Sequence, residues 1–137
     1  WTGVVLDMPA PTDPTGAPPT RRLEDRERLP VLDREEGLRL AAGKADLEED
    51  MLRMLINSLP EERSRIEGHL IANQPEALLE VIHKLHGACR YCGVPQLRAC
   101  CQRAEELLKR GQPNQLAISQ LIEAIERLQA AYVTESA

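Results

Sequence analysis

The stretch PEALLEVIHKLHGACRYCG, residues 75–93, decides the fold of this 137-residue chain. Its apolar side chains recur every three or four residues, which is the spacing of one helix face. Pro75 suits the first turn of a helix, because the N–H that proline lacks has no intrahelical partner there. The stretch therefore predicts an amphipathic helix from Pro75, and the buried side of that helix is Leu78, Ile82, Leu85 and Cys89.

Two more helices are expected upstream of this stretch. Asp33 is placed to cap a short helix through about Ala41, and a longer helix begins near Lys44. We expect Pro60 to bend the longer helix rather than end it, because an apolar stripe continues across the proline. That stripe is Leu47, Met51, Leu55, Leu59, Ile66 and Leu70.

Two further helices are expected downstream. One follows Gly93 and closes with Gly111 as its C-cap, and the other begins at about Asn114. Their apolar seams are Val94, Leu97, Cys101, Ala104 and Leu108, and then Ile118, Leu121, Ile125, Leu128 and Tyr132. Because the connections are short, the long helices are expected to be antiparallel neighbours. We therefore predict an all-α fold, an up-down antiparallel four-helix bundle with a short extra N-terminal helix.

Composition divides the chain into two parts. Six of the ten prolines lie in the first 30 residues, mixed with Thr, Gly and Asp, which is typical of a flexible linker. We assign residues 1–31 to that linker and residues 32–137 to the bundle, which is long enough to fold independently. Since the chain has no Phe, one Trp and two Tyr, the core must be aliphatic. The chain begins with Trp1 rather than Met, so we expect it to be a fragment of a longer protein.

Charge, hydropathy and cysteine spacing exclude several classes of protein. A formal net charge of −5 is too acidic for a general nucleic-acid binder. No run approaches the roughly 18 apolar residues of a transmembrane helix, so no direct membrane contact is expected. The four cysteines all fall between Cys89 and Cys101, too close together to cross-link distant parts of a fold. We interpret them as reduced thiols of a cytoplasmic protein, with Cys92 and Cys100 partly exposed.

His83 is the candidate functional residue of the helix that begins at Pro75. At about 100° per residue it points roughly 140° away from the buried side, so its imidazole faces solvent. Gly87 lies one turn further on, where a side chain would lean back over the imidazole. A glycine there costs the helix roughly 1 kcal/mol relative to alanine, and close approach of another molecule would explain it.

Positive charge surrounds His83 on this acidic chain. Lys84 and His86 flank it, and Arg90 lies two turns further on at nearly the same face. Such a surround suits a phosphoryl group carried by an imidazole. An ordinary imidazole is mostly neutral near pH 7, so one ring nitrogen has a lone pair for attack without a partner base. Because the chain has no Gly-rich phosphate loop, the other half of the active site is expected to come from a partner.

The string HKLHG at residues 83–87, followed by Gly93, resembles the histidine-containing phosphotransfer (HPt) domain. The longer string HKLHGACRYCGVPQL is similar to the C-terminal HPt module of hybrid sensor histidine kinases of the BarA/GacS type. The resemblance covers about residues 32–137. One departure is visible, because most such domains have Lys three residues after the acceptor, where this chain has His86.

The resemblance implies a function for the exposed histidine. His83 would accept a phosphoryl group from a receiver domain of the same kinase and pass it to the receiver domain of a response regulator. Lys84, His86, Gly87 and Arg90 would surround the phosphate, and Leu79 would join them in docking the partner. The fragment would have no ATP site and would bind no cofactor, since Mg²⁺ would sit on the receiver. It would be monomeric, and a cytoplasmic module of an inner-membrane protein.

Two other interpretations stay open. In the first, the His83 face binds a partner helix without phosphorylation, as a non-catalytic interaction module. In the second, His83, His86, Cys89 and Cys92 form an H-x-x-H-x-x-C-x-x-C zinc site. Steps of three on a continuous helix turn each ligand about 60° from the last, so only a break near Gly87 would let the ligands converge. We therefore predict no metal site.

The remaining polar residues are expected to be structural. His69 is most simply a solvated or capping residue near the end of its helix. The acidic runs are expected to be solvated helix faces with no reason to act as paired catalytic carboxylates. These runs are Glu48-Glu49-Asp50, Glu61-Glu62 and Glu105-Glu106.

Overall fold

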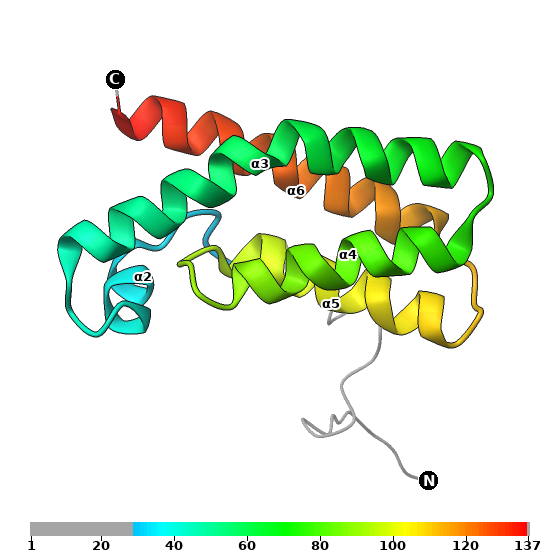
Figure 1. Ribbon diagram of the computed structural model, residues 1–137, viewed down its shortest axis with the longest axis horizontal. Helices are drawn as coiled ribbons and strands as arrows, with labels where there is room; N and C mark the ends of the chain where they lie inside the picture. Colours follow the sequence, from blue (N-terminus) through cyan, green and yellow to red (C-terminus); the bar gives the residue numbers. More distant parts are fainter. Residues whose placement is uncertain (1–28, 137) are drawn as a thin grey trace, which may run out of the picture.

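The structure of the chain, a computed structural model, describes residues 29–136 (Figure 1). All regular structure in this part of the chain is helical. A short helix, α2 (Arg34–Leu40), precedes four longer ones: α3 (Ala45–Ile71), α4 (Pro75–Cys89), α5 (Pro95–Lys109) and α6 (Gln115–Ser136). The predicted all-α class, and the order of one short and four long helices, are confirmed.

Each long helix packs against two others. Helix α3 contacts α4 and α6, and α5 contacts the same two helices, so the four enclose one core. Neighbouring helices run antiparallel, and α3 changes direction partway along its length (Figure 1). Pro60 lies inside α3 without ending it, as predicted. The largest fully buried side chains are Leu52, Leu59, Ile66, Ile82, Leu85, Leu97, Ile118, Leu121, Ile125 and Leu128.

One predicted core position in α3 is wrong. Leu47 is 42% exposed, and Leu52 is buried in its place. Leu47 belongs to the first turn of α3, and this end of the helix extends past the end of α4 (Figure 1). Its periodicity is helical, but no long helix covers that turn.

The loop between α4 and α5 meets the start of α2 at Gly93. The Asp33 N–H donates to the Gly93 carbonyl oxygen at 2.8 Å, and the Asp33 carboxylate caps α2 by accepting from the Glu36 N–H at 3.0 Å. A Cβ on Gly93 would lie 1.9 Å from the Asp33 carbonyl oxygen and 2.7 Å from the Gly37 nitrogen. A side chain at this position would therefore push α2 away from the bundle.

Gly93→Ala is expected to lower the free energy of unfolding by about 2–4 kcal/mol, because the backbone of two segments must shift to admit the methyl group. Chemical denaturation followed by circular dichroism measures the loss. Gly87→Ala is the matched control, since a Cβ there meets nothing within 4 Å. The control should be neutral or slightly stabilising, and equal losses in both variants would contradict the steric argument.

Contacts with the bundle begin at residue 29. The Gln96 N–H donates to the Pro30 carbonyl oxygen, and the Gln96 side-chain amide donates to the Leu29 carbonyl oxygen, both at 3.1 Å. Val31 packs against the core. The last residues assigned to the linker thus lie on the bundle, and its other residues, 1–28, are outside the described part.

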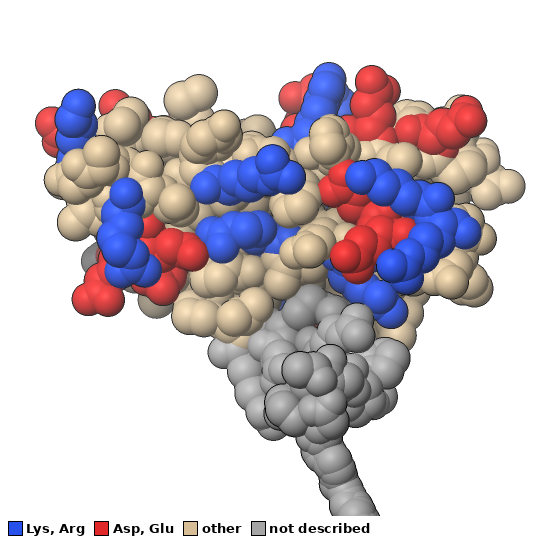
Figure 2. All heavy atoms as spheres, turned by 90° about the horizontal axis from the view of Figure 1, so that it is seen from below, with Lys and Arg blue, Asp and Glu red and all other residues tan. Residues whose placement is uncertain are grey.

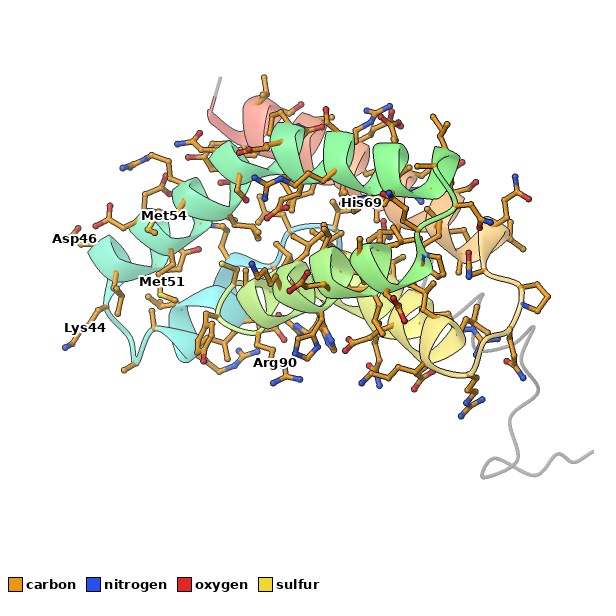
Figure 3. All side chains as sticks on the ribbon, turned by 45° about the vertical axis from the view of Figure 1, so that its right-hand side comes forward. Lys44, Asp46, Met51, Met54, His69 and Arg90 are labelled. Atoms are coloured by element: carbon orange, nitrogen blue, oxygen red, sulfur yellow. The ribbon has the colours of Figure 1, made fainter. Side chains whose placement is uncertain are left out.

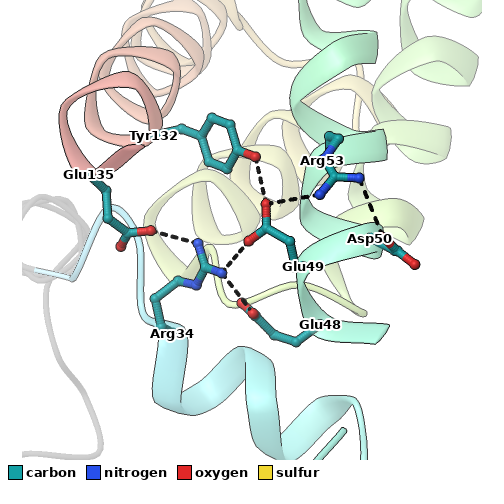
Figure 4. A network of polar contacts seen from close by, with 7 residues as sticks. All are labelled: Arg34, Glu48, Glu49, Asp50, Arg53, Tyr132 and Glu135. Carbon is teal, nitrogen blue, oxygen red and sulfur yellow. Dashed lines mark hydrogen bonds and ion pairs between the residues drawn. The ribbon is translucent and has the colours of Figure 1, made fainter. Parts of the chain in front are cut away.

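The first acidic run is only partly a solvated face: Asp50 is 64% exposed as expected, but Glu48 and Glu49 belong to a polar network (Figure 4). Arg34 donates to Glu48 at 2.8 Å, to Glu49 at 2.5 Å and to Glu135 at 2.6 Å. The Tyr132 hydroxyl also donates to Glu49, at 2.8 Å. Glu48 is buried because α2 covers it, and these charges connect α2 and α3 to the end of α6.

All four cysteines are free thiols and all are buried, so the expected partial exposure of Cys92 and Cys100 is wrong. Burial raises the pKa of Cys92 to about 11 and also raises that of Cys101. Both thiols are therefore protonated near pH 7. Among residues 29–136 no helix combines the length and apolar content needed to cross a membrane.

Candidate functional site

Helix α4 presents His83 to solvent. The four positions predicted for its inner side are all buried in the core. The side chain of His83, on the opposite side, is 64% exposed. The amphipathic pattern alone therefore placed the imidazole correctly.

Glu105, from the neighbouring helix α5, holds the ring of His83. His83 Nδ1 lies 2.5 Å from Glu105 Oε2, and His86 Nδ1 lies 2.9 Å from the other oxygen, Oε1. Lys109 Nζ lies 3.3 Å from Oε2. The Glu105 side chain is only 8% exposed, so one buried carboxylate connects two histidines and a lysine at the edge of the bundle.

The ionisation of Glu105 decides which nitrogen of His83 is available. Burial raises the pKa of Glu105, but hydrogen bonds from His83, His86 and Lys109 outweigh it and lower the pKa to about 2. An ionised carboxylate only accepts hydrogen bonds, so His83 Nδ1 must carry the proton. The lone pair is then on Nε2, which is the nitrogen free of that contact.

The interpretation of Glu105 as part of a solvated face is wrong, because its side chain is 8% exposed and contacts His83, His86 and Lys109. The signal lay in the helical spacing of α5. Position 105 comes four residues after Cys101 and three before Leu108, so it adjoins the apolar seam. A carboxylate at such a position is taken out of water and needs a partner. Sequence alone did not show that the partner would be His83.

The other residues proposed around His83 divide into two groups. Leu79 is half-buried and lines a shallow hollow together with His83, Glu105 and Lys109. Lys84 and Arg90 are exposed and lie on either side of the direction in which His83 points. The structure brings Leu79 beside the imidazole and leaves the two cations at the surface, where an incoming anion would meet them.

His86 and Gly87 have different surroundings from each other. The His86 side chain is 12% exposed and bonded to Glu105, so it supports the carboxylate instead of pointing to solvent. A Cβ on Gly87 would meet nothing within 4 Å, which means that no packing within the described residues requires a glycine there. Its absent side chain leaves open space one turn beyond His83.

The zinc arrangement is not formed. Helix α4 is continuous through Gly87, with Cys89 buried in the core and His83 exposed on the other side. Within residues 29–136 no group of three or more ligand side chains is placed to hold a metal ion. His69 lies near the turn that leads into α4, whereas Arg90 lies at the far end of that helix (Figure 3). The Nδ1 atom of His69 is 2.8 Å from Gln74 Oε1.

The surface has a mixed charge pattern. On the side of the bundle seen from below the view of Figure 1, basic side chains extend along much of the length (Figure 2). Acidic side chains lie among them toward both ends (Figure 2). An acidic chain with a net charge of −5 thus still offers local positive surface.

Comparison with known proteins gives consistent matches. The chain is 53% identical over 131 residues to the sensor protein GacS of Pseudomonas syringae pv. syringae, covering 95% of this chain and 14% of that protein. It is 43% identical over 98 residues to the signal transduction histidine-protein kinase BarA of Escherichia coli K12, covering 72% of this chain and 11% of that protein. The chain therefore spans about one seventh or less of these relatives.

A solved structure resembles the fold. The crystal structure of the HPT domain from a sensor hybrid histidine kinase of Shewanella superposes with a TM-score of 0.70 at 38% identity. The match covers 74% of this chain and 89% of that one. The sequence model of the Hpt domain matches residues 50–131, more than half of the chain and the part that contains His83 and Glu105. The chain therefore belongs to the Hpt domain family, the phosphotransfer modules of two-component signalling.

Proposed function

We propose that His83 accepts a phosphoryl group from the aspartyl phosphate of a receiver domain and passes it to the receiver domain of a response regulator. The first receiver belongs to the same hybrid kinase, of which this chain is the C-terminal module. That module lies in the cytoplasm and acts as a monomer. The names of the relatives, a sensor protein and a histidine-protein kinase, support this context.

The reaction at His83 is an in-line displacement. Nε2 attacks the phosphorus, the bond from phosphorus to the aspartyl oxygen breaks, and the carboxylate leaves on the receiver. In the second transfer an aspartate oxygen of the response regulator attacks, and Nε2 leaves with its electron pair. Each transfer therefore makes one bond to phosphorus and breaks one.

Glu105 stabilises the state formed in between. Attack by Nε2 places positive charge on the imidazole ring, while Nδ1 keeps its proton. The ionised carboxylate of Glu105 lies against that proton at 2.5 Å and compensates the charge. Because Glu105 is also bonded to His86 and Lys109, it is oriented before the partner arrives.

The partner supplies the rest of the site. A receiver domain would contribute Mg²⁺ and its own cation, so this chain provides the nucleophile and its position. Lys84 and Arg90 would face the phosphate, and Leu79 and the open space at Gly87 would admit the receiver surface. The single observation that carries the proposal is the exposed imidazole held through Nδ1 by a buried carboxylate.

The direct test is to incubate the full chain with a phosphorylated receiver domain and to locate acid-labile phosphate by mass spectrometry. We expect it on His83 alone, and we expect no label from ATP without the kinase. Binding of the receiver without transfer would instead support a non-catalytic interaction module. Phosphate on His69 or His86 would contradict the assignment of the acceptor.

Gly87→Leu is expected to slow transfer from the receiver about 10-fold or more. A leucine at this position leans back toward the N-terminus of the helix and covers the imidazole. The matched variant Gly87→Ala should transfer at a rate close to that of the wild type and raise the free energy of unfolding by about 0.5–1 kcal/mol. A fast Gly87→Leu variant would show that the glycine does not serve the approach of the partner.

A further inference from the structure

The exposed face of α4, together with its C-cap residue Arg90, carries four charged side chains that have no partner among residues 29–136. Glu76, Glu80, Lys84 and Arg90 are all exposed, and none forms a hydrogen bond or ion pair with another residue of the described part. By contrast, most charged side chains of α3 are paired, either with one another, with Arg34 of α2 or with α6. All three Glu and Lys side chains within α4 are therefore unpaired among the described residues.

These four charges are arranged by sign along the helix. At about 100° per residue they all point within about 60° of one direction, and His83 shares that direction. Both carboxylates precede His83 and both cations follow it. At about 1.5 Å per residue, the pattern extends about 21 Å, roughly the size of a docking footprint centred on the acceptor.

The stability of α4 accounts for only part of this arrangement. The helix macrodipole favours an acidic residue in the first turn and a basic one at the end, which explains Glu76 and Arg90. Glu80 and Lys84 lie further inside, where that effect has faded. Glu four residues before Lys is the favourable order on a helix, but the two side chains form no ion pair in the described part. Glu76 and Glu80 are four residues apart, and like charges at this spacing weakly destabilise a helix.

We propose that the face around His83 recognises the charge polarity of its receiver partner, that is, the order in which basic and acidic side chains lie on the partner's surface. The partner that fits has basic side chains opposite Glu76 and Glu80 and acidic side chains opposite Lys84 and Arg90. Only one orientation of the partner along α4 pairs both the acidic and the basic side chains with opposite charges. The charges therefore select the partner and set the orientation in which it docks over Nε2. This inference rests on the proposed function, because it describes the docking step of the same transfer.

The test compares reversed charges on either side of His83. Transfer from the receiver of the same kinase, preloaded with acetyl phosphate, is measured for Glu80→Lys, Lys84→Glu and the double variant. If polarity is recognised, each single variant slows transfer about 3- to 10-fold at low ionic strength, and the double variant is slower than either. If only net charge matters, the two singles act in opposite directions and the double variant returns to the wild-type rate.

A second donor separates docking from chemistry. Phosphoramidate transfers its phosphoryl group to an imidazole with loss of ammonia and needs no docking surface. Each receiver rate is therefore divided by the phosphoramidate rate of the same variant, which removes any direct effect of Lys84 on the incoming phosphate. A wild-type chain labelled by phosphoramidate but not by the receiver would refute the proposed function. If the wild type does accept phosphate from the receiver, the rates of the charge variants test the docking proposal alone.

Matched controls come from the start of α3. Lys44 and Asp46 are also exposed and unpaired and lie at the edge of the molecule (Figure 3), so Lys44→Glu and Asp46→Lys change the net charge equally. They should leave transfer unchanged. The slowing by the α4 variants should vanish at about 0.5 M salt, where surface charges are screened. Opposite effects of the two α4 singles, or no effect of either, would overturn the proposal.

Discussion

His83→Gln is expected to abolish acid-labile phosphorylation and to leave the helical circular dichroism spectrum unchanged. Glutamine has no nucleophilic ring nitrogen, so the phosphoryl group has no acceptor. The fold should persist because the side chain is 64% exposed and glutamine is a good helix former. Glu105 keeps two of its three contacts, those with His86 and Lys109. Transfer from a labelled receiver, followed over time, measures the loss.

His69→Gln is the matched control for this experiment. It makes the same substitution at a histidine in the last turn of α3, whose Nδ1 contacts only Gln74 within the described residues. This variant should be labelled as fast as the wild type. Persistent labelling of His83→Gln, or loss of labelling in His69→Gln, would show that another residue is the acceptor.

Most of the fold could be predicted because its determinants are local. The apolar spacing, the prolines at helix starts and the glycine after α5 each act within a few residues, and they gave the order and ends of the helices. Leu47 shows where local pattern fails. Its spacing fits the stripe of α3, but its burial depends on how far α4 extends, which is a property of the assembled bundle.

The two glycines that follow His83 illustrate the same distinction. Both belong to the string that carries the family resemblance, and that string alone does not separate their roles. Gly93 is required by the backbone of Asp33, which is 60 positions away in sequence, whereas Gly87 has open space around it. Only the folded chain shows that Gly93 is structural and that Gly87 is left available to a partner.

The site was half predictable from sequence. His83 was found from its own helix, because exposure follows from periodicity along α4. Its partner was not, because Glu105 is 22 residues away on another helix, and that contact depends on the packing of α4 against α5. The expectation that the imidazole attacks without a partner base stays a prediction, but a carboxylate that the sequence did not indicate lies against its other nitrogen. A neutral imidazole has a lone pair on one ring nitrogen, and the ionised carboxylate of Glu105 against Nδ1 determines that this nitrogen is Nε2.

Glu105→Ala is expected to slow transfer to His83 about 10- to 100-fold. Without the carboxylate, the proton can move to Nε2 and the ring can turn, so fewer molecules present the lone pair to the phosphorus. The positive charge on the ring also loses its compensation in the transition state. The loss should therefore appear with phosphoramidate as well as with the receiver, and at saturating receiver concentration. A loss confined to low receiver concentration would mean that Glu105 acts in docking instead.

Glu106→Ala is the matched control, because Glu106 is the next residue and its side chain is 44% exposed. It should leave transfer and stability nearly unchanged. Glu105→Gln separates charge from shape: its amide oxygen can still accept from Nδ1, so it should orient the ring and recover part of the rate lost in the alanine variant. Equal rates in the alanine and glutamine variants would assign the whole effect to charge.

The same glutamine variant tests the ionisation of Glu105 through stability. The pKa of Glu105 is about 2 in the folded chain, below its ordinary value of 4.5, so the carboxylate's hydrogen bonds stabilise the fold fully above about pH 4.5. That stabilisation is lost as the pH falls toward 2. The difference in unfolding free energy between wild type and Glu105→Gln should therefore shrink over this interval and stay constant above it. A difference that does not change with pH would mean that Glu105 is not held as an anion, and the assignment of the free lone pair to Nε2 would lose its basis.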